Sequence, residues 1–279
     1  MKTSAAKRFL LRWTCILIGL YLLVVIAAML AETKLVFIGA EHYWKTPSNP
    51  RFQEIALVSG EGNSMACLWL PNEKSPCERA VIFFNGNGGN ASGCTDLAEQ
   101  LQKTLDSSVL LIDYPGYGNS EGKPSEAGCY ANATAGMEWL IQVQKIPAGK
   151  IVLMGLSLGG GVAVEMATKY PARALVVVSS YTSLPDAAKA RFPFLPTKWL
   201  MKNRFDSITK ISRVNSPVFV AHGTDDRTIP FSQGEKLFTA ANEPKRFSRL
   251  EGLGHNGCLT VELLKSIGQF LNETQSAKP

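Results

Sequence analysis

The sequence lacks the cysteine and histidine patterns that hold metals. Among 279 residues it has three histidines and six cysteines, with no CxxC pair and no cysteine–histidine spacing of a zinc site. It also lacks runs of lysine and arginine interleaved with aromatic residues, although its net charge is +6. We therefore expect no metal, no cofactor and no nucleic-acid partner. The basic excess fits the surface of an anionic membrane better.

One long stretch lacks charge altogether. Residues 13–31 contain no charged side chain, and as a helix they would extend about 28 Å, close to the hydrocarbon thickness of a bilayer. The run is long for a signal peptide, and Met29-Leu30-Ala31 lacks the small residue that a cleavage site needs two positions before its last residue. We expect residues 1–31 to be a retained transmembrane anchor, with a cleaved signal peptide as the alternative.

The charges on either side of this span predict its direction. Basic residues precede the span, and the flank that follows it is mixed, beginning with Glu32 and Lys34. The basic residues are Lys2, Lys7, Arg8 and Arg12. Because positive flanks stay in the cytoplasm, we expect the N-terminus inside and the rest of the chain outside, on the periplasmic side if the cell is Gram-negative.

The cysteines outside the span do not show whether the protein contains disulfides. Cys15 lies in the span, and the others are Cys67, Cys77, Cys94, Cys129 and Cys258. A compartment outside the cytoplasm would permit one or two disulfides among them. Their number is odd and their spacing selects no pairing, so free buried thiols are equally compatible with the sequence.

The rest of the chain alternates between apolar runs and helix-like stretches. Residues 32–50 are expected to form a linker that ends in a proline-rich turn, and residues 51–279 one domain. A hairpin is expected at residues 52–58 and 64–70, then buried strands at 80–84, 108–112, 151–154, 174–178 and 218–221, and a last strand at 245–250. Helices are expected at residues 94–105, 126–144, 159–169, 231–241 and 259–271. This alternation predicts an α/β fold, with a mostly parallel central sheet flanked by helices.

Unusual loops follow the expected strands, at the edge where parallel sheets place their sites. After the strand at residues 151–154 comes Gly155-Leu156-Ser157-Leu158-Gly159, a G-x-S-x-G pattern. The pattern alone is weak, because a chain with 24 glycines can match it by chance. Its position at a strand-to-helix turn is more specific, because such a turn exposes the serine hydroxyl at the positive end of a helix. Ser157 is therefore the candidate nucleophile.

A serine nucleophile needs a general base, and only three histidines can supply it. His42 lies next to the predicted span, and His222 precedes a glycine at a strand end, where we expect it to pack a loop. His255 lies in a glycine-rich loop after the last strand, free to approach a neighbouring strand end. We predict His255 as the base. Asp225 and Asp226, after the strand at residues 218–221, are both candidates for the acid that orients it.

Negative charge on an attacked carbonyl requires two hydrogen-bond donors. The N–H of Leu158 is free at the start of the expected helix. The loop at residues 85–90 (Asn-Gly-Asn-Gly-Gly-Asn) follows the strand at residues 80–84. The N–H of Asn87 is the second candidate donor, since the glycines on either side of it permit a close approach.

Together these segments resemble the α/β-hydrolase superfamily. The similarity extends over residues 50–272 and rests on the loop at 85–90, the segment 113–118 (Asp-Tyr-Pro-Gly-Tyr-Gly), the elbow at 155–160, the run 222–230 and His255. It is greatest for membrane-anchored members with a small lid, which include lysophospholipases, protein depalmitoylases and uncharacterised bacterial hydrolases. The resemblance implies a triad of Ser157, Asp226 and His255, with Asp226 preferred to Asp225. One departure is Asn85, because this loop usually opens with His-Gly in the superfamily.

The insertion before the strand at residues 218–221 is the expected lid, at residues 184–215. It carries seven basic and two acidic residues, together with Phe192, Phe194 and Trp199, which are candidate substrate contacts. An apolar and basic lid fits a fatty acyl chain with an anionic neighbour, or the membrane surface itself. Packing of these side chains onto the core is the alternative.

The sequence therefore predicts a membrane-anchored serine hydrolase that cleaves carboxylic esters or thioesters through an acyl-enzyme. Its substrate would be a small molecule or lipid that carries an acyl ester. A serine peptidase or amidase uses the same residues and is an alternative, although no acidic group in the lid stands out as a partner for a peptide amine. A catalytically inactive binding module on the same fold is the other alternative.

Overall fold

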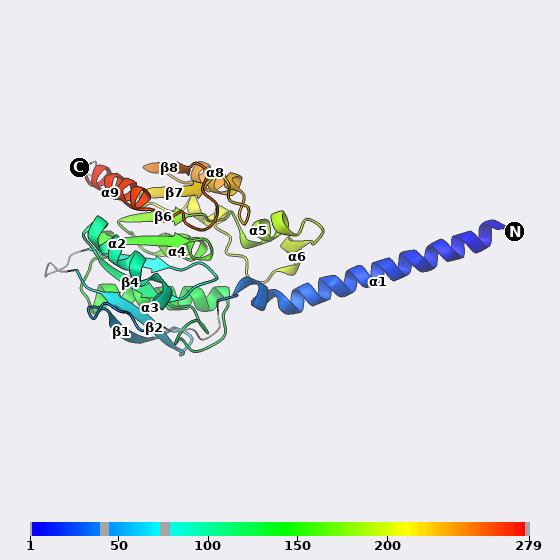
Figure 1. The fold of residues 1–279 in the computed structure, drawn as a ribbon, viewed down its shortest axis with the longest axis horizontal. Coiled ribbons are helices and arrows are strands. Elements are labelled where there is room, and N and C mark those ends of the chain that lie inside the picture. The colour runs from blue at the N-terminus through cyan, green and yellow to red at the C-terminus, as the bar shows by residue number, and fades with distance from the viewer. Residues whose placement is uncertain (1, 40–44, 73–78, 277–279) are drawn as a thin grey trace.

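An eight-stranded sheet forms the centre of the computed structural model, which describes residues 2–39, 45–72 and 79–276 (Figure 1). The strand order is β1-β2-β4-β3-β5-β6-β7-β8. The strands are β1 (Gln53–Val58), β2 (Ser64–Leu70), β3 (Ala80–Phe84), β4 (Ser108–Ile112), β5 (Ile151–Leu156), β6 (Ala174–Val178), β7 (Val218–Gly223) and β8 (Lys245–Leu250). β1 and β2 form an antiparallel hairpin and β2 is antiparallel to β4, whereas the other neighbours are parallel. The predicted α/β architecture is confirmed.

Helices cover both faces of this sheet. One face carries α3 (Glu126–Gln142), α4 (Leu158–Lys169) and α8 (Phe231–Ala240), and the other carries α2 (Thr95–Leu105) and α9 (Val261–Ser276). Short 3-10 turns, η1 (Ala91–Cys94) and η2 (Ala148–Lys150), precede α2 and β5. The lid predicted between β6 and β7 contains α5 (Leu184–Arg191), α6 (Thr197–Leu200) and α7 (Ile208–Ile211).

Alternate side chains of the central strands build two cores. On β5, Ile151 and Leu153 join the cluster beneath α3 and α4, whereas Val152 and Met154 join the cluster beneath α2 and α9. Full burial of one such side chain contributes about 1.5–3 kcal/mol. The two cores therefore fix the positions of the strand ends, where the unusual loops begin.

The N-terminal helix α1 (Lys2–Val36) projects away from the domain (Figure 1). Its segment Ala6–Val36 is long and apolar enough to cross a membrane. The helix continues beyond residue 31, where the predicted anchor ends, because no proline or glycine follows before Gly39. Val36 and the next residue, Phe37, are buried against the domain. The first part of the predicted linker is thus helical and packed, and residues 40–44 of that linker lie outside the described residues.

The described cysteines outside α1 are unpaired. Cys67, Cys94, Cys129 and Cys258 are free thiols, and Cys77 lies outside the described residues. Burial, reinforced by the nearby Asp113 carboxyl group, raises the pKa of the Cys94 thiol to about 12, which keeps it protonated.

Candidate active site

Ser157 lies on a sharp turn between β5 and α4. β5 ends at Leu156 and α4 begins at Leu158, so a single residue joins the strand to the helix. Ser157 has φ 53° and ψ −115°, a strained conformation for a residue with a side chain. Its N–H donates to the Val178 carbonyl at 2.9 Å, and its carbonyl accepts from Ser180 Oγ at 2.9 Å. These two bonds to the end of β6 hold the strained backbone in place.

Close backbone contacts explain the two glycines of the G-x-S-x-G pattern. A Cβ atom on Gly155 would lie 2.2 Å from the carbonyl oxygen of Gly159. A Cβ atom on Gly159 would lie 2.0 Å from the carbonyl oxygen of Phe84, at the end of β3. Both distances are far shorter than van der Waals contact. The turn thus brings β3, β5 and α4 together more closely than any side chain permits.

His255 connects Ser157 to Asp226. Its Nε2 lies 3.1 Å from Ser157 Oγ, and its Nδ1 lies 2.7 Å from Asp226 Oδ2. The three residues follow β5, β7 and β8, so three separate strand ends meet here. The Asp226 side chain is fully buried and that of His255 is 16% exposed. With hydrogen on Nδ1, the His255 ring presents its other nitrogen to the Ser157 hydroxyl, which is the geometry required for proton transfer.

Asp226, rather than Asp225, faces the histidine. Asp225 is exposed, and its carboxylate accepts from Thr224 Oγ1 at 3.4 Å. Asp226 Oδ1 accepts the backbone N–H groups of Thr228 and Ile229, both at 2.8 Å. These bonds occupy one carboxylate oxygen and leave the other directed at His255.

A second histidine, His222, contacts the same carboxylate. Its ring is fully buried, and its Nε2 lies 2.9 Å from the Ile229 carbonyl oxygen and 3.3 Å from Asp226 Oδ2. Burial raises the pKa of Asp226, but hydrogen bonds from His222, His255 and the Ile229 N–H outweigh burial and hold that pKa well below its usual range. Asp226 therefore stays ionised at neutral pH. The sequence indicated only loop packing for His222, because its contact depends on how the loop after β7 folds back.

The loop at residues 85–90 lies beside Ser157, as predicted for an oxyanion loop. A Cβ atom on Gly86 would be 3.6 Å from Cβ of Ser157. Among the described residues, no acceptor is recorded for the N–H of Asn87 or for that of Leu158. Both donors are thus available to a bound oxygen atom.

Asn85 supports this loop from within the domain. The residue is buried, and its Nδ2 donates to the Ile112 carbonyl at 3.4 Å. Its Oδ1 accepts from Cys94 Sγ at 3.2 Å, and its carbonyl accepts from Tyr114 Oη at 2.7 Å. The asparagine that departs from the superfamily pattern therefore ties the loop to the end of β4 and to η1.

The end of α1 and the residues after it also hold the loop at residues 85–90. Asn87 Nδ2 donates to the Val36 carbonyl at 2.9 Å, and the Asn87 carbonyl accepts from the Gly39 N–H at 2.7 Å and from Tyr117 Oη at 3.0 Å. A Cβ atom on Gly39 would lie 2.8 Å from the Asn87 carbonyl oxygen, so only glycine fits. No local pattern in the sequence indicates this contact, because residues far apart in the chain form it.

The aromatic residues predicted to contact substrate lie on the lid and face solvent. Their exposed fractions are 41% for Phe192, 60% for Phe194 and 90% for Trp199. Phe192 and Phe194 meet edge to face, with ring centroids 6.3 Å apart. Among the described residues, no contact is recorded between these three side chains and Ser157 or His255. The structure therefore pairs Phe192 with Phe194 and leaves Trp199 exposed, with none of the three at Ser157.

Known proteins are similar to this chain in sequence and in fold. A family model described as the α/β hydrolase fold matches residues 79–208. An uncharacterized protein of Mycobacterium tuberculosis is 36% identical over 228 residues, which cover 81% of this chain and 81% of that protein. The α/β hydrolase domain-containing protein 17B of Homo sapiens is 30% identical over 219 residues, which cover 77% of this chain and 73% of that protein. A solved esterase of Pyrococcus furiosus has the same fold, with a TM-score of 0.67 at 17% identity over 84% of this chain and 97% of that one. The chain belongs to the α/β-hydrolase family.

Proposed function

We propose that this hydrolase cleaves carboxylic esters or thioesters, with Ser157 as the nucleophile. The supporting observation is the chain of contacts from Asp226 through His255 to Ser157 Oγ, at 2.7 and 3.1 Å. A serine hydroxyl beside an imidazole that an ionised carboxylate orients can lose its proton as it attacks a carbonyl. The elbow places that hydroxyl at the N-terminus of α4, where negative charge is favoured.

The proposed reaction has two halves. Ser157 Oγ adds to the carbonyl carbon while its proton passes to His255 Nε2, and Asp226 stabilises the resulting imidazolium. The N–H groups of Leu158 and Asn87 bind the oxyanion. Collapse of the intermediate releases the alcohol or thiol, protonated by His255, and leaves Ser157 acylated. A water molecule deprotonated by His255 then attacks the acyl group, releasing the acid and the free serine.

The proposed location is a membrane, with α1 as the anchor and the N-terminus inside. The support is the length and apolar composition of α1 and the basic residues at its start. The hydrolase domain would then lie outside the cytoplasm. α1 and the lid helices α5 and α6 lie on the same side of the domain (Figure 1), so the lid would face the proposed membrane. An acyl lipid or an acylated molecule held at that surface is the proposed substrate.

Hydrolysis of chromogenic acyl esters of increasing chain length tests this function. The full-length protein in detergent should cleave them, and Ser157→Ala should lower kcat on the order of 10⁴- to 10⁶-fold. Ser48→Ala, at an exposed serine before β1, is the matched control and should keep full activity. Full activity of Ser157→Ala would rule out the nucleophile. Cleavage of amides but not esters, still dependent on Ser157, would identify a peptidase or amidase instead.

A further inference from the structure

The lid ends in an exposed apolar tip, which we define as residues 191–199, the segment from the end of α5 into α6. Phe194 is 60% exposed and Trp199 is 90% exposed. Leu195 and Leu200 are only partly buried beside them. Large aromatic side chains grouped on a surface in this way mark a contact with another apolar phase more often than a solvated loop.

The lid tip lies against α1. Tyr21 Oη donates to the Phe194 carbonyl at 2.9 Å, so the tip reaches the helix well before its end at Val36. At a rise of 1.5 Å per residue, Tyr21 lies roughly 15 Å along the helix from residue 31, the outer end of the predicted span. If the helix is tilted, the depth of Tyr21 below the membrane surface is less than this distance along the helix, but the tip still lies at the level of the span. If α1 crosses a membrane, the lid tip reaches the outer leaflet.

Contacts at the base of the lid fix its position relative to α1. The Glu32 carboxylate accepts the backbone N–H of Lys202 at 3.0 Å, and both the N–H and the Nδ2 of Asn203 at 2.9 and 3.0 Å. One turn further on, Phe37 packs against Phe205 of the lid, with ring centroids 6.4 Å apart. The end of α1 and the base of the lid are therefore a single packed unit.

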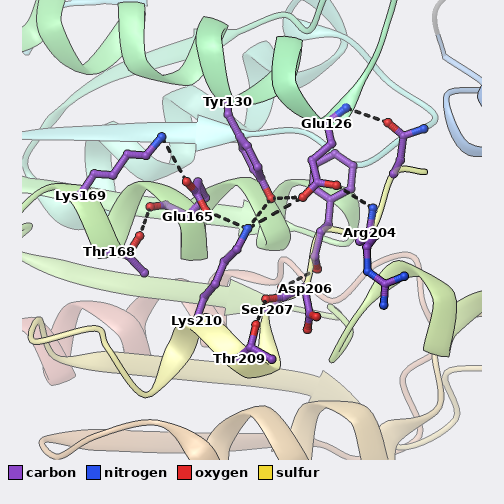
Figure 2. Close-up of polar contacts among 12 residues, drawn as sticks. Glu126, Tyr130, Glu165, Thr168, Lys169, Arg204, Asp206, Ser207, Thr209 and Lys210 are labelled. Atoms are coloured by element: carbon purple, nitrogen blue, oxygen red, sulfur yellow. Dashed lines mark hydrogen bonds and ion pairs between the residues drawn. The ribbon is translucent and has the colours of Figure 1, made fainter. Parts of the chain in front are cut away.

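A polar network joins the lid base to the body of the domain (Figure 2). The N–H of Arg204 donates to Glu126 at 2.6 Å, and Lys210 pairs with Glu165 of α4 at 2.8 Å. Tyr130 Oη links the two pairs, since it donates to Glu126 at 2.8 Å and accepts from Lys210 at 3.0 Å. The base of the lid is thus fixed both to the end of α1 and to the domain. The lid tip therefore lies along α1 and does not cover the domain.

Positive charge surrounds the apolar tip. Exposed basic side chains lie within it, at Arg191 and Lys198, and just beyond its ends, at Lys189 and Lys202. The acidic residue in the same stretch, Asp186, pairs with Lys198 at 3.2 Å. Apolar side chains with a rim of long basic ones are the composition of segments that insert at a lipid interface, where the cations meet anionic headgroups.

We propose that the lid tip docks into the outer leaflet of the membrane that α1 spans, with Phe192, Phe194 and Trp199 among the acyl chains. This inference rests on the proposed membrane anchoring and deepens the proposed function. The hydrolase takes its acylated substrate directly from the bilayer beside the lid, without release into water. The three aromatic side chains then contact lipid, and their exposure in the protein itself is explained.

Tryptophan quenching tests the docking without reference to activity. The full-length protein is inserted in phosphatidylcholine–phosphatidylglycerol vesicles whose acyl chains carry bromine. The difference in fluorescence between the wild type and Trp199→Phe isolates Trp199. We expect brominated chains to quench this component and aqueous iodide to leave it unchanged. Quenching by iodide but not by bromine would overturn the docking. Protection from both quenchers would also overturn it, and would indicate a protein partner or a second copy.

Hydrolysis in the same vesicles tests the consequence for substrate supply. The variant Phe194→Ser/Trp199→Ser should cleave a long-chain ester embedded in the bilayer about tenfold more slowly, because part of two aromatic burial energies is lost. Its rate on a short, water-soluble ester should stay unchanged. Val143→Ser, at an apolar position after α3 that is as exposed as Phe194, should leave both rates unchanged.

Equal loss on both esters would place the aromatic residues in the catalytic site and overturn the docking. Ser157→Ala separates this inference from the proposed function. If neither ester is cleaved in a manner that depends on Ser157, the proposed function fails, and the quenching result still decides whether the lid tip docks.

Discussion

At the scale of single residues, the candidate site depends on which partners bind each oxygen of the Asp226 carboxylate. Asp226 Oδ1 is bound by two backbone N–H groups, and Oδ2 receives His255 and, more distantly, His222. The neighbouring Asp225 has the same chemistry but faces solvent. The two adjacent aspartates thus form a matched pair for mutation.

Replacement of each aspartate by asparagine should separate them. Asp226→Asn should lower kcat by about 10⁴-fold, because the amide favours the wrong tautomer of His255 and cannot stabilise its cation. Asp225→Asn should keep activity near that of the wild type. Steady-state ester hydrolysis by the two variants gives the comparison. Equal losses for both variants would argue against Asp226 as the acid of the triad.

Asp113, at the end of β4, should make stability depend on pH. Burial, opposed by the hydrogen bond from the Ala91 N–H at 2.6 Å, raises the pKa of Asp113 from 3.8 to about 7. Among the described residues, its Oδ2 has no partner. Between these pH values the folded state binds a proton that the unfolded state lacks. The free energy of unfolding therefore falls as pH rises through this window, by up to about 1.4 kcal/mol per unit.

Asp113→Asn should remove this dependence, because an amide does not ionise. Urea unfolding between pH 4.5 and 8 should show the variant gaining stability relative to the wild type as pH rises to about 7, with a constant difference above it. Asp225→Asn, at an exposed site, is the control and should follow the wild type. Parallel curves for the Asp113 variant and the wild type would contradict a buried, protonated Asp113.

At the scale of elements, the site is assembled from strand ends and from the chain that follows α1. β3 leads into the candidate oxyanion loop, β5 into the turn at Ser157, and β7 and β8 into the loops of Asp226 and His255. The segment after α1 adds two hydrogen bonds to Asn87, through Val36 and Gly39. A change in this segment should therefore act on catalysis through the oxyanion loop.

Gly39→Ala should slow the reaction with little change in KM. Its Cβ would lie 2.8 Å from the Asn87 carbonyl oxygen and would displace that residue. Because a lost oxyanion donor costs about 10²- to 10³-fold in kcat, a displaced one should cost on the order of tenfold or more. Gly60→Ala is the control, since a Cβ there would have nothing within 4 Å. An unchanged kcat for Gly39→Ala would mean that this segment does not position the loop.

At the scale of the whole molecule, α1 has two parts with different surroundings. Its apolar length projects from the domain (Figure 1). Glu32 is buried against the lid, and Val36 is buried against the loop at residues 85–90. One helix therefore contains both the proposed membrane anchor and residues that contact the candidate site. A truncation before Glu32 and a truncation after Gly39 should therefore have different effects on activity.

A chain that begins at residue 32 should leave the membrane fraction after cell fractionation and keep its activity on soluble esters. A chain that begins at residue 41 should also become soluble but lose activity, because Phe37 and the bonds to Asn87 are removed. Sedimentation and ester hydrolysis measure the two effects. If the first truncation stays in the membrane fraction, α1 is not the anchor. If the second is fully active, the segment after α1 has no role in the site.

The sequence by itself determined the order of strands and helices, because each short apolar run and each turn is a local pattern. It also singled out Ser157 and His255, since a glycine-flanked serine at a strand end and a chain with three histidines leave few choices. Local patterns did not separate Asp225 from Asp226 without the family resemblance. Adjacent residues have the same local surroundings, and only the folded loop turns one of them inward.

Only the tertiary structure decided the contacts between segments far apart in the chain. His222 beside Asp226, Val36 and Gly39 on Asn87, and Tyr21 against the lid all depend on packing across the domain. No periodicity or spacing encodes such contacts, because they arise when the two cores bring strand ends and helix ends together. For the same reason, the sequence divided the chain at residue 31 into anchor and linker, whereas in the folded protein the helix continues to Val36, which binds Asn87 of the candidate site.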